Sequence, residues 1–277
     1  MQLISTIAAL RERLKQEHSI AFIPTMGNLH EGHLNLMRQG RQHGKCVVAS
    51  IFVNPLQFGP SEDFEQYPRT LEADCEKLAD IVDVVFAPAV NEMYPVRQSV
   101  FVEPPPIADE WCGAARPGHF RGMATVVLKL LNIVQPQVAL FGKKDYQQLH
   151  IIREMVAQLN LPVVIVGGET VRAADGLALS SRNQYLNTVE REEATFLHQT
   201  LRDISAKVLG GARDFMALQH DAVTMLSKRG WMVDYVAICN QSDLLPADAQ
   251  QRDWVVIAAA KLGRTRLLDN VEIGLDA

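Results

Sequence analysis

Two histidines and a glycine lie where an apolar strand is expected to turn into a helix. The segment His30-Glu31-Gly32-His33 follows a mostly apolar run and precedes residues with helical spacing. Main-chain N–H groups and the positive end of the helix dipole point outward at such a turn, which suits a triphosphate. Gly32 has no Cβ, so a ligand can approach the main chain closely. The pattern favours nucleotide binding, and its alternative is a pair of surface histidines at an ordinary turn.

Three further polar clusters follow candidate strands. In the turn 54–59, Asn54 and Gln57 carry neutral amides, which suit a substrate with hydroxyls beside a carboxylate. The segment 142–148 places a Gly-Lys turn at a helix start, which is typical of a phosphate-facing turn, and Asp145 is equally explained as an ordinary N-cap. The segment 175–183 supplies two hydroxyls and a guanidinium. Each cluster alone is also explained by a solvated turn, but four at one sheet edge indicate a site.

A zinc site is a weaker interpretation of the histidines. Zinc proteases carry histidines at i and i+4 with Glu beside the first, whereas here they stand at i and i+3 with the glycine between. The four cysteines form no CxxC pair, which argues against a metal finger or a disulfide scaffold. We expect buried free thiols in a reducing compartment.

The elements that must position these clusters alternate between strand and helix in the first part of the chain. Such alternation indicates βαβ units and a parallel sheet, whose ligands bind beyond the carboxyl ends of the strands. The expected strands are Ser19–Pro24, Cys46–Val53, Asp83–Ala87, Arg97–Val102, Gln137–Phe141 and Pro162–Val166, and the expected helices are His33–His43, Leu71–Ala79, Gly122–Val134 and Tyr146–Leu159.

The pattern changes after Gly167-Gly168. Long helices are expected first, at Val189–Leu209 and Asp214–Lys228, and strands afterwards, at Met232–Ile238, Trp254–Ala259 and Thr265–Asp269. Grouped helices and strands are typical of a separate α+β domain. The sequence therefore predicts an α/β protein with a Rossmann-like domain at 1–169 and a smaller α+β domain at 170–277.

Composition sets broad limits on function. The chain has 277 residues and a net charge of −5, which argues against a broad nucleic-acid-binding face. No apolar run approaches the about 18 residues of a membrane span, and the N-terminus lacks a signal-peptide pattern. We therefore expect a cytoplasmic protein that binds no membrane.

Several motifs together resemble one family, the pantothenate synthetases, also called pantoate–β-alanine ligases. The resemblance runs in order over nearly the whole chain, although the His-x-Gly-His turn alone is shared by many nucleotidylyltransferases and class I aminoacyl-tRNA synthetases. The motifs are Pro24-Thr25-Met26-Gly27, Leu29-His30-Glu31-Gly32-His33, Phe52-Val53-Asn54-Pro55, Gln57-Phe58, Tyr67-Pro68-Arg69-Thr70, Lys144-Asp145-Tyr146-Gln147-Gln148, Ser180-Ser181-Arg182-Asn183 and Arg264-Thr265-Arg266-Leu267-Leu268-Asp269-Asn270.

The resemblance implies a Rossmann-like domain, a smaller C-terminal lid domain and a homodimer. It also implies an ATP- and Mg²⁺-dependent ligase that condenses (R)-pantoate with β-alanine to give pantothenate, AMP and pyrophosphate through a pantoyl-adenylate intermediate. Position 143 departs from the family pattern, because Lys stands where an acidic or amide residue is common. Position 179 is Leu where some members have Met, which conserves volume.

The resemblance also implies residue roles. It makes His33 the proton donor, with His30 and Lys144 as further catalytic groups, while Asp74 is a Mg²⁺ contact or, equally, a solvated helix acid. Pantoate is expected at Asn54, Gln57 and Gln148, with β-alanine also near Gln57. The residues expected to bind ATP are Met26, Gly27, Asn28, Leu29, His30, Glu31, Gly32, His33, Gly142, Lys143, Lys144, Asp145, Val171, Leu179, Ser180, Ser181 and Arg182.

Two other functions stay open at this point. A nucleotidylyltransferase with a phosphorylated substrate shares the histidine turn but needs more cationic groups in place of the amides. A regulatory module that binds nucleotide without turnover shares every motif. An aminoacyl-tRNA synthetase is disfavoured, because the chain is short and acidic.

Overall fold

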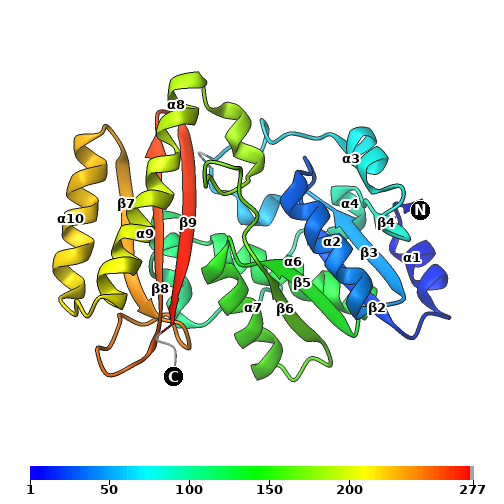
Figure 1. Ribbon diagram of the computed structural model, residues 1–277. Helices are drawn as coiled ribbons and strands as arrows, with labels where there is room; N and C mark the ends of the chain where they lie inside the picture. The colour runs from blue at the N-terminus through cyan, green and yellow to red at the C-terminus, as the bar shows by residue number, and fades with distance from the viewer. Residues whose placement is uncertain (61, 275–277) are drawn as a thin grey trace. The chain divides into compact units, whose positions relative to one another are not determined.

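The chain folds into two compact units in a computed structural model that describes residues 1–60 and 62–274 (Figure 1). The first unit comprises residues 1–106, 116–143 and 151–169. The second comprises residues 107–115, 144–150 and 170–277. The longest segment of the second unit thus begins at Thr170, whereas its two short segments come from the part of the chain that we assigned to the first domain.

The first unit is built on a six-stranded sheet in the order β1-β4-β3-β2-β5-β6, and every pairing in it is parallel. The strands are β1 (Gln2–Ile4), β2 (Ile20–Thr25), β3 (Cys46–Ile51), β4 (Val84–Phe86), β5 (Val138–Gly142) and β6 (Val164–Gly168). β2 and β3 lie in the middle and are buried almost throughout, as their near-continuous apolar runs predict. This arrangement confirms the Rossmann-like fold class.

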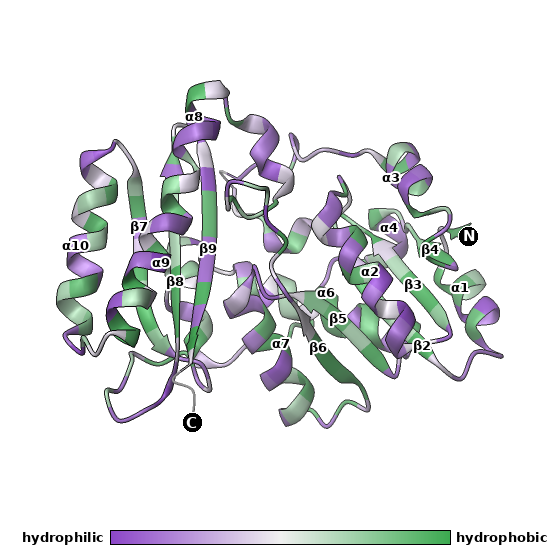
Figure 2. Ribbon diagram, viewed as in Figure 1, coloured by the Kyte–Doolittle hydropathy of each residue, from purple (hydrophilic) through white to green (hydrophobic). Residues whose placement is uncertain are grey.

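Helices join the strands. They are α1 (Ile7–Leu14), α2 (Glu31–His43), α3 (Leu71–Leu78), α4 (Val90–Met93), α6 (His119–Val134) and α7 (Tyr146–Gln158), with a 3₁₀ turn, η1, at Pro55–Gln57. α2 packs Leu36 and Met37 against Ala21 and Ile23 of β2. Figure 2 shows the expected division, with hydrophobic strands and a hydrophilic face on α2.

One expected strand of the first unit is wrong. Residues 97–102 are irregular and pair with no strand of the described chain. The main-chain N–H of Val102 instead donates to Thr125 Oγ1 on α6, at 3.0 Å. Pro95 and the three prolines at 104–106 flank this stretch, and proline has no N–H to donate to a strand partner. Conversely, the sequence did not predict β1, which is only three residues long and too short to show a strand pattern. It did not predict α1 either.

The second unit contains an antiparallel sheet in the order β7-β8-β9. Its strands are β7 (Met232–Asn240), β8 (Asp253–Leu262) and β9 (Thr265–Gly274), and its helices and turns are η2 (Pro106–Asp109), α5 (Cys112–Ala115), η3 (Ser181–Tyr185), α8 (Thr188–Glu193), α9 (Thr195–Leu209) and α10 (Phe215–Lys228). The single helix expected at Val189–Leu209 is divided at Ala194 into α8 and α9.

Both faces of β8 are buried, which explains the composition of the second unit. Trp254 and Val256 belong to a core formed with α9 and α10. Their neighbours Val255 and Ile257 point to the other face, where they pack with Tyr146 and with residues of segment 107–115. The two short segments of the second unit therefore cover a sheet face that water would otherwise reach. In the described residues, no helix is long and apolar enough to cross a membrane.

Candidate active site

The turn between β2 and α2 is held by a carboxylate from α3. Asp74 is fully buried, and its Oδ2 and Oδ1 accept hydrogen bonds from the main-chain N–H groups of Asn28 and Leu29, each at 2.8 Å. Gly27 has φ +84°, and a Cβ there would lie 3.1 Å from Asp74 Oδ2. Glycine is therefore required both for the backbone angle and for the close approach of the carboxylate.

The two histidines cap each other at the start of α2. His30 Nδ1 accepts from the main-chain N–H of Gly32 at 3.2 Å, and His33 Nδ1 accepts from the main-chain N–H of His30 at 3.3 Å. An accepting Nδ1 carries no proton, so in each neutral ring the proton is on Nε2. The ring centroids are 4.1 Å apart. The turn thus fixes two imidazole N–H donors side by side at a helix N-terminus.

The amides of the second cluster are buried, which rules out the alternative of exposed amides at a turn. Asn54 is 1% exposed and Gln57 is 8% exposed. Asn54 Nδ2 donates to Gln57 Oε1 at 3.1 Å, and its Oδ1 accepts from the Tyr94 hydroxyl at 2.8 Å. Gln57 Nε2 lies 3.1 Å from Met26 Sδ, in the turn after the neighbouring strand β2. The Asn54–Gln57 turn therefore contacts the turn that follows β2, and both lie at the carboxyl ends of these neighbouring strands.

Sequence reasoning missed an ion-pair network that holds the turn around Gln57. Arg116 donates to both carboxylate oxygens of Glu62, each at 2.6 Å, and lies 3.0 Å from His119 Nε2. His119 Nδ1 lies 2.8 Å from the Gln57 carbonyl oxygen. Burial is the largest single influence and raises the pKa of Glu62, but the hydrogen bonds and the positive charge of Arg116, with smaller contributions from neighbouring groups, together hold that pKa below its ordinary value. The sequence signal that could have indicated this network is the pair Arg116 and His119, which precedes the apolar part of α6.

Lys143, where the chain departs from the family pattern, directly follows β5 at the same sheet edge. Its main-chain N–H donates to the Gly168 carbonyl at 2.8 Å, which continues the β5–β6 pairing. Its ammonium lies 2.6 Å from the Glu169 carboxylate. The additional positive charge is therefore paired rather than left to act on a phosphate alone.

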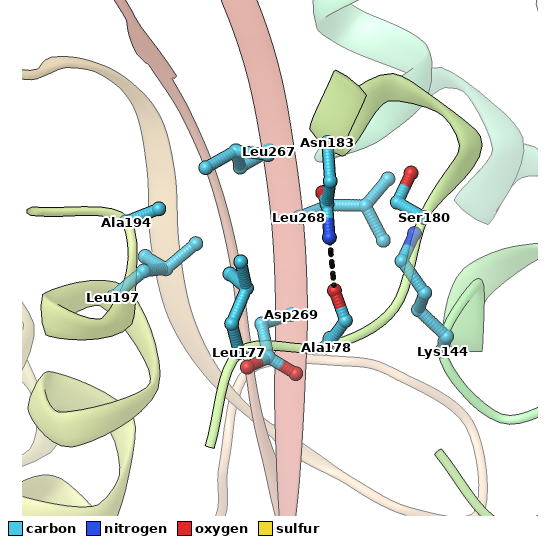
Figure 3. A pocket seen from close by; sticks show the side chains of 10 residues that line it. All are labelled: Lys144, Leu177, Ala178, Ser180, Asn183, Ala194, Leu197, Leu267, Leu268 and Asp269. Atoms are coloured by element: carbon cyan, nitrogen blue, oxygen red, sulfur yellow. Dashed lines mark hydrogen bonds between the residues drawn. The ribbon is translucent and has the colours of Figure 1, made fainter. Parts of the chain in front are cut away.

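The remaining expected nucleotide residues lie in the second unit. Val171 and Leu179 face each other in a small hairpin, where the Leu179 N–H donates to the Val171 carbonyl at 3.0 Å. Ser180 begins η3, and its Oγ accepts from the Arg182 N–H at 3.3 Å. Lys144 and Ser180 line one small hollow, in which Figure 3 shows the lysine chain extending toward the serine.

The polar residues at the start of α7 differ in their burial. Asp145 is exposed directly before the helix, and Gln148 is half-buried in its first turn. Gln147 between them is buried, because its amide donates to the main-chain oxygens of Ile107 and Glu110. Gln147 is therefore held by the protein itself, and Gln148 is the more exposed of the two amides.

The fit of Mg²⁺ to the protein is poor. The oxygens of Asp74 already accept from two main-chain N–H groups and from the Thr70 hydroxyl, so the carboxylate anchors the turn rather than presenting itself to a metal. Within residues 1–60 and 62–274, no group of three or more His, Cys, Asp or Glu side chains is arranged to hold an ion.

Comparison with known proteins gives one family. The family model described as pantoate–β-alanine ligase matches residues 2–272. The pantothenate synthetase of Nitrosospira multiformis is 58% identical over 99% of this chain and 98% of its own length. That of Chromobacterium violaceum is 55% identical over 99% of both chains.

Solved structures agree. The pantothenate synthetase of Thermus thermophilus superposes with a TM-score of 0.94 at 44% identity, covering 99% of this chain and all of that one. The pantoate–β-alanine ligase of Francisella tularensis, solved in complex with beta-gamma ATP and β-alanine, superposes with a TM-score of 0.82 at 33% identity over 98% of this chain and 97% of its own. A match of this extent in sequence and in structure leads to one conclusion: the chain belongs to the pantoate–β-alanine ligase family.

Proposed function

We propose that this enzyme condenses (R)-pantoate with β-alanine in an ATP-dependent reaction that proceeds through pantoyl adenylate. A pantoate carboxylate oxygen attacks the α-phosphorus of ATP, and pyrophosphate leaves. The amine of β-alanine then attacks the acyl carbon, AMP leaves, and the amine loses a proton. Neither step needs a protein nucleophile, so the protein aligns the reactants and stabilises developing charge.

The observation that carries this proposal is the pair of capped imidazoles at the start of α2, together with the buried amides of Asn54 and Gln57 that follow the neighbouring strand β3. His30 and His33 donate to the phosphates as negative charge builds at the α-phosphorus, and His33 is the proton donor. Gln57, with Asn54 behind it, accepts and donates to the hydroxyls and carboxylate of pantoate, and later lies near β-alanine. The residues from Met26 to Leu29 lie along the nucleotide.

The same proposal gives phosphate-binding roles to residues of the second unit. Lys144 acts as a point charge on the phosphates, and Ser180, Ser181 and Arg182 bind the β- and γ-phosphates. Val171 and Leu179 flank the adenosine, and Gln148 is a second amide for pantoate. Mg²⁺ is carried by the nucleotide's own phosphates and by water, as is usual for this ion, and its bound charge offsets that of the phosphates.

The test is an ATP–pyrophosphate exchange assay with the purified chain. Exchange that depends on pantoate, followed by formation of AMP and pantothenate on addition of β-alanine, supports the proposal. Exchange that depends on a phosphomonoester instead favours a nucleotidylyltransferase. Binding of ATP without exchange under any of these conditions favours a regulatory module.

We also propose that the protein is cytoplasmic and, as the resemblance implies, that it is a homodimer. Light scattering on a size-exclusion column distinguishes a dimer from a 30.8 kDa monomer.

A further inference from the structure

Strand β9 presents two different polar residues to its two faces. Because side chains alternate along a strand, the neighbours Asp269 and Asn270 point in opposite directions. On one face, Leu267 packs in the core formed with α9, and Asp269 follows on that side. On the other face, Asn270 meets segment 144–150: its Nδ2 donates to the Lys144 carbonyl at 2.9 Å.

Asp269 is a buried carboxylate that lies between a guanidinium and an imidazole. It is 4% exposed, and Arg172 donates to its two oxygens at 2.7 and 2.8 Å. His198 Nδ1 on α9 lies 3.3 Å from Oδ2, although it is not aligned as a hydrogen bond. Burial acts to raise the pKa of Asp269, but His198 and Arg172 outweigh it and keep the pKa below its ordinary value. Asp269 is therefore a charged anchor.

Arg172 links Asp269 to the hairpin that precedes Ser180. Its Nη1 donates to the Gly176 carbonyl at 3.1 Å, and its Nη2 donates to the Asn270 carbonyl at 3.1 Å. Gly176 has φ +92°, and a Cβ there would lie 2.9 Å from His198 Cδ2. The hairpin therefore lies directly against the cluster around Asp269 and has little freedom to shift.

We propose that Asp269 and Asn270 are positioning residues that hold Lys144 and the Ser180–Arg182 loop in register with each other. Neither residue is expected to contact ATP. Asn270 binds the main chain of Lys144, and Asp269 binds Arg172 in the hairpin that leads to Ser180. The two are also tied together, since the Asn270 N–H donates to Asp269 Oδ1 at 2.7 Å. The inference deepens the proposed function and rests on it, because it concerns the same phosphate-binding groups.

The structure offers a matched control for a test at Asn270. Asn240, on β7 of the same sheet, is 7% exposed against 6% for Asn270. It also bonds to a main chain, since its Oδ1 accepts from the Asp248 N–H at 3.0 Å, but it contacts neither phosphate segment. Asn240→Ala and Asn270→Ala therefore remove similar buried amides from one sheet, and both are expected to lower the melting temperature by similar amounts.

The experiment measures melting temperature and pantoate-dependent ATP–pyrophosphate exchange in wild type, Asn270→Ala, Asn240→Ala and Arg172→Lys. We expect kcat/KM for ATP to fall about 10- to 100-fold in Asn270→Ala and about tenfold in Arg172→Lys, the scale of one lost hydrogen bond to an active-site segment. The KM for pantoate should change less than about threefold, and Asn240→Ala should match wild type in both kinetic constants.

Several results would overturn the inference. One is a folded Asn270→Ala with wild-type kcat/KM for ATP, and another is an equal loss in Asn240→Ala. If Asn270→Ala does not fold, Arg172→Lys decides, because it keeps the positive charge and loses only the paired hydrogen bonds. Failure of the wild type itself to show exchange would overturn the proposed function, and the inference with it. If the wild type is active and the variants keep its kcat/KM for ATP, the inference is wrong but the proposed function stands.

Discussion

The turn at the start of α2 and the hairpin before η3 are both assigned to phosphate, but they are held in different ways. In the turn, His30 and His33 are neighbours in sequence that cap each other through main-chain N–H groups. In the hairpin, the anchor of Arg172 is Asp269, 97 residues further along the chain. The first geometry is mostly local, whereas the second exists only once β9 is in place.

This difference has a physical consequence. Groups held by reciprocal capping need little more than a formed helix end, so substitutions there act mainly on the chemistry of the removed side chain. Groups held by buried ion pairs depend on two distant side chains, and removal of either leaves the other charge buried and unpaired. We therefore expect substitutions in the histidine turn to reduce mainly activity, and substitutions around Asp269 to reduce activity and stability together.

The largest expected effect is at His33. His33→Ala should slow adenylate formation by about two to four orders of magnitude, because it removes a donor to the reacting phosphate. The cost in stability should stay near 1 kcal/mol, the usual value of a lost cap. Single-turnover pyrophosphate release measures the first quantity and urea unfolding the second. His43→Ala, an exposed site at the other end of α2, is the control. A folded His33→Ala with near-normal release would show that the assignment is wrong.

Asp74 tests whether the turn is as local as its caps suggest. Asp74→Asn should lower the free energy of unfolding by about 3 kcal/mol, because the new NH₂ would face a main-chain N–H group in a buried site. Activity should fall with stability, while the Mg²⁺ concentration for half-maximal rate stays unchanged. A variant of normal stability that needs much more Mg²⁺ would instead make Asp74 a metal contact.

Gln57 tests the substrate side of the first unit. Gln57→Ala should raise the KM for pantoate about 10- to 100-fold, because a buried hydrogen bond to a charged substrate is lost. The KM for ATP should be unchanged, in contrast to the variants of the β9 anchors. Steady-state kinetics with each substrate varied in turn separate the two. A change confined to ATP would mean that the substrate map is wrong.

The smallest effect concerns the ion pair of Glu62 and Arg116 and its dependence on pH. The pKa of Glu62 is lowered in the folded protein, so its contribution is present above the unfolded carboxyl pKa of about 4.3 and is lost as the pH falls through the folded value. Because the pair is partly exposed, we expect about 1 kcal/mol at pH 7 relative to Glu62→Gln. Urea unfolding of both proteins from pH 7 to pH 3.5 should show this difference shrinking. A difference that grows on acidification would contradict the assignment.

Much of this arrangement follows from sequence for a simple reason. The buried runs at Ile20–Thr25 and Cys46–Ile51 are nearly continuous, and alternation with helices then implies parallel neighbours whose carboxyl ends meet. The histidine turn and the Asn54–Gln57 turn each follow such a strand, so the sequence alone predicts that both lie at one edge of the sheet. The strand expected at 97–102 was wrong because β-branched residues alone do not supply a pairing partner.

The sequence by itself therefore determined the fold class, the histidine turn and the family. Only the tertiary structure decided that Asp74 serves the turn and that His119 contacts the carbonyl of Gln57. It also decided that Asp269 binds Arg172 and that Asn270 binds the main chain of Lys144. The reason is that periodicity and turn chemistry act between near neighbours in sequence. A buried carboxylate finds its partners through packing of distant elements, which no local pattern encodes.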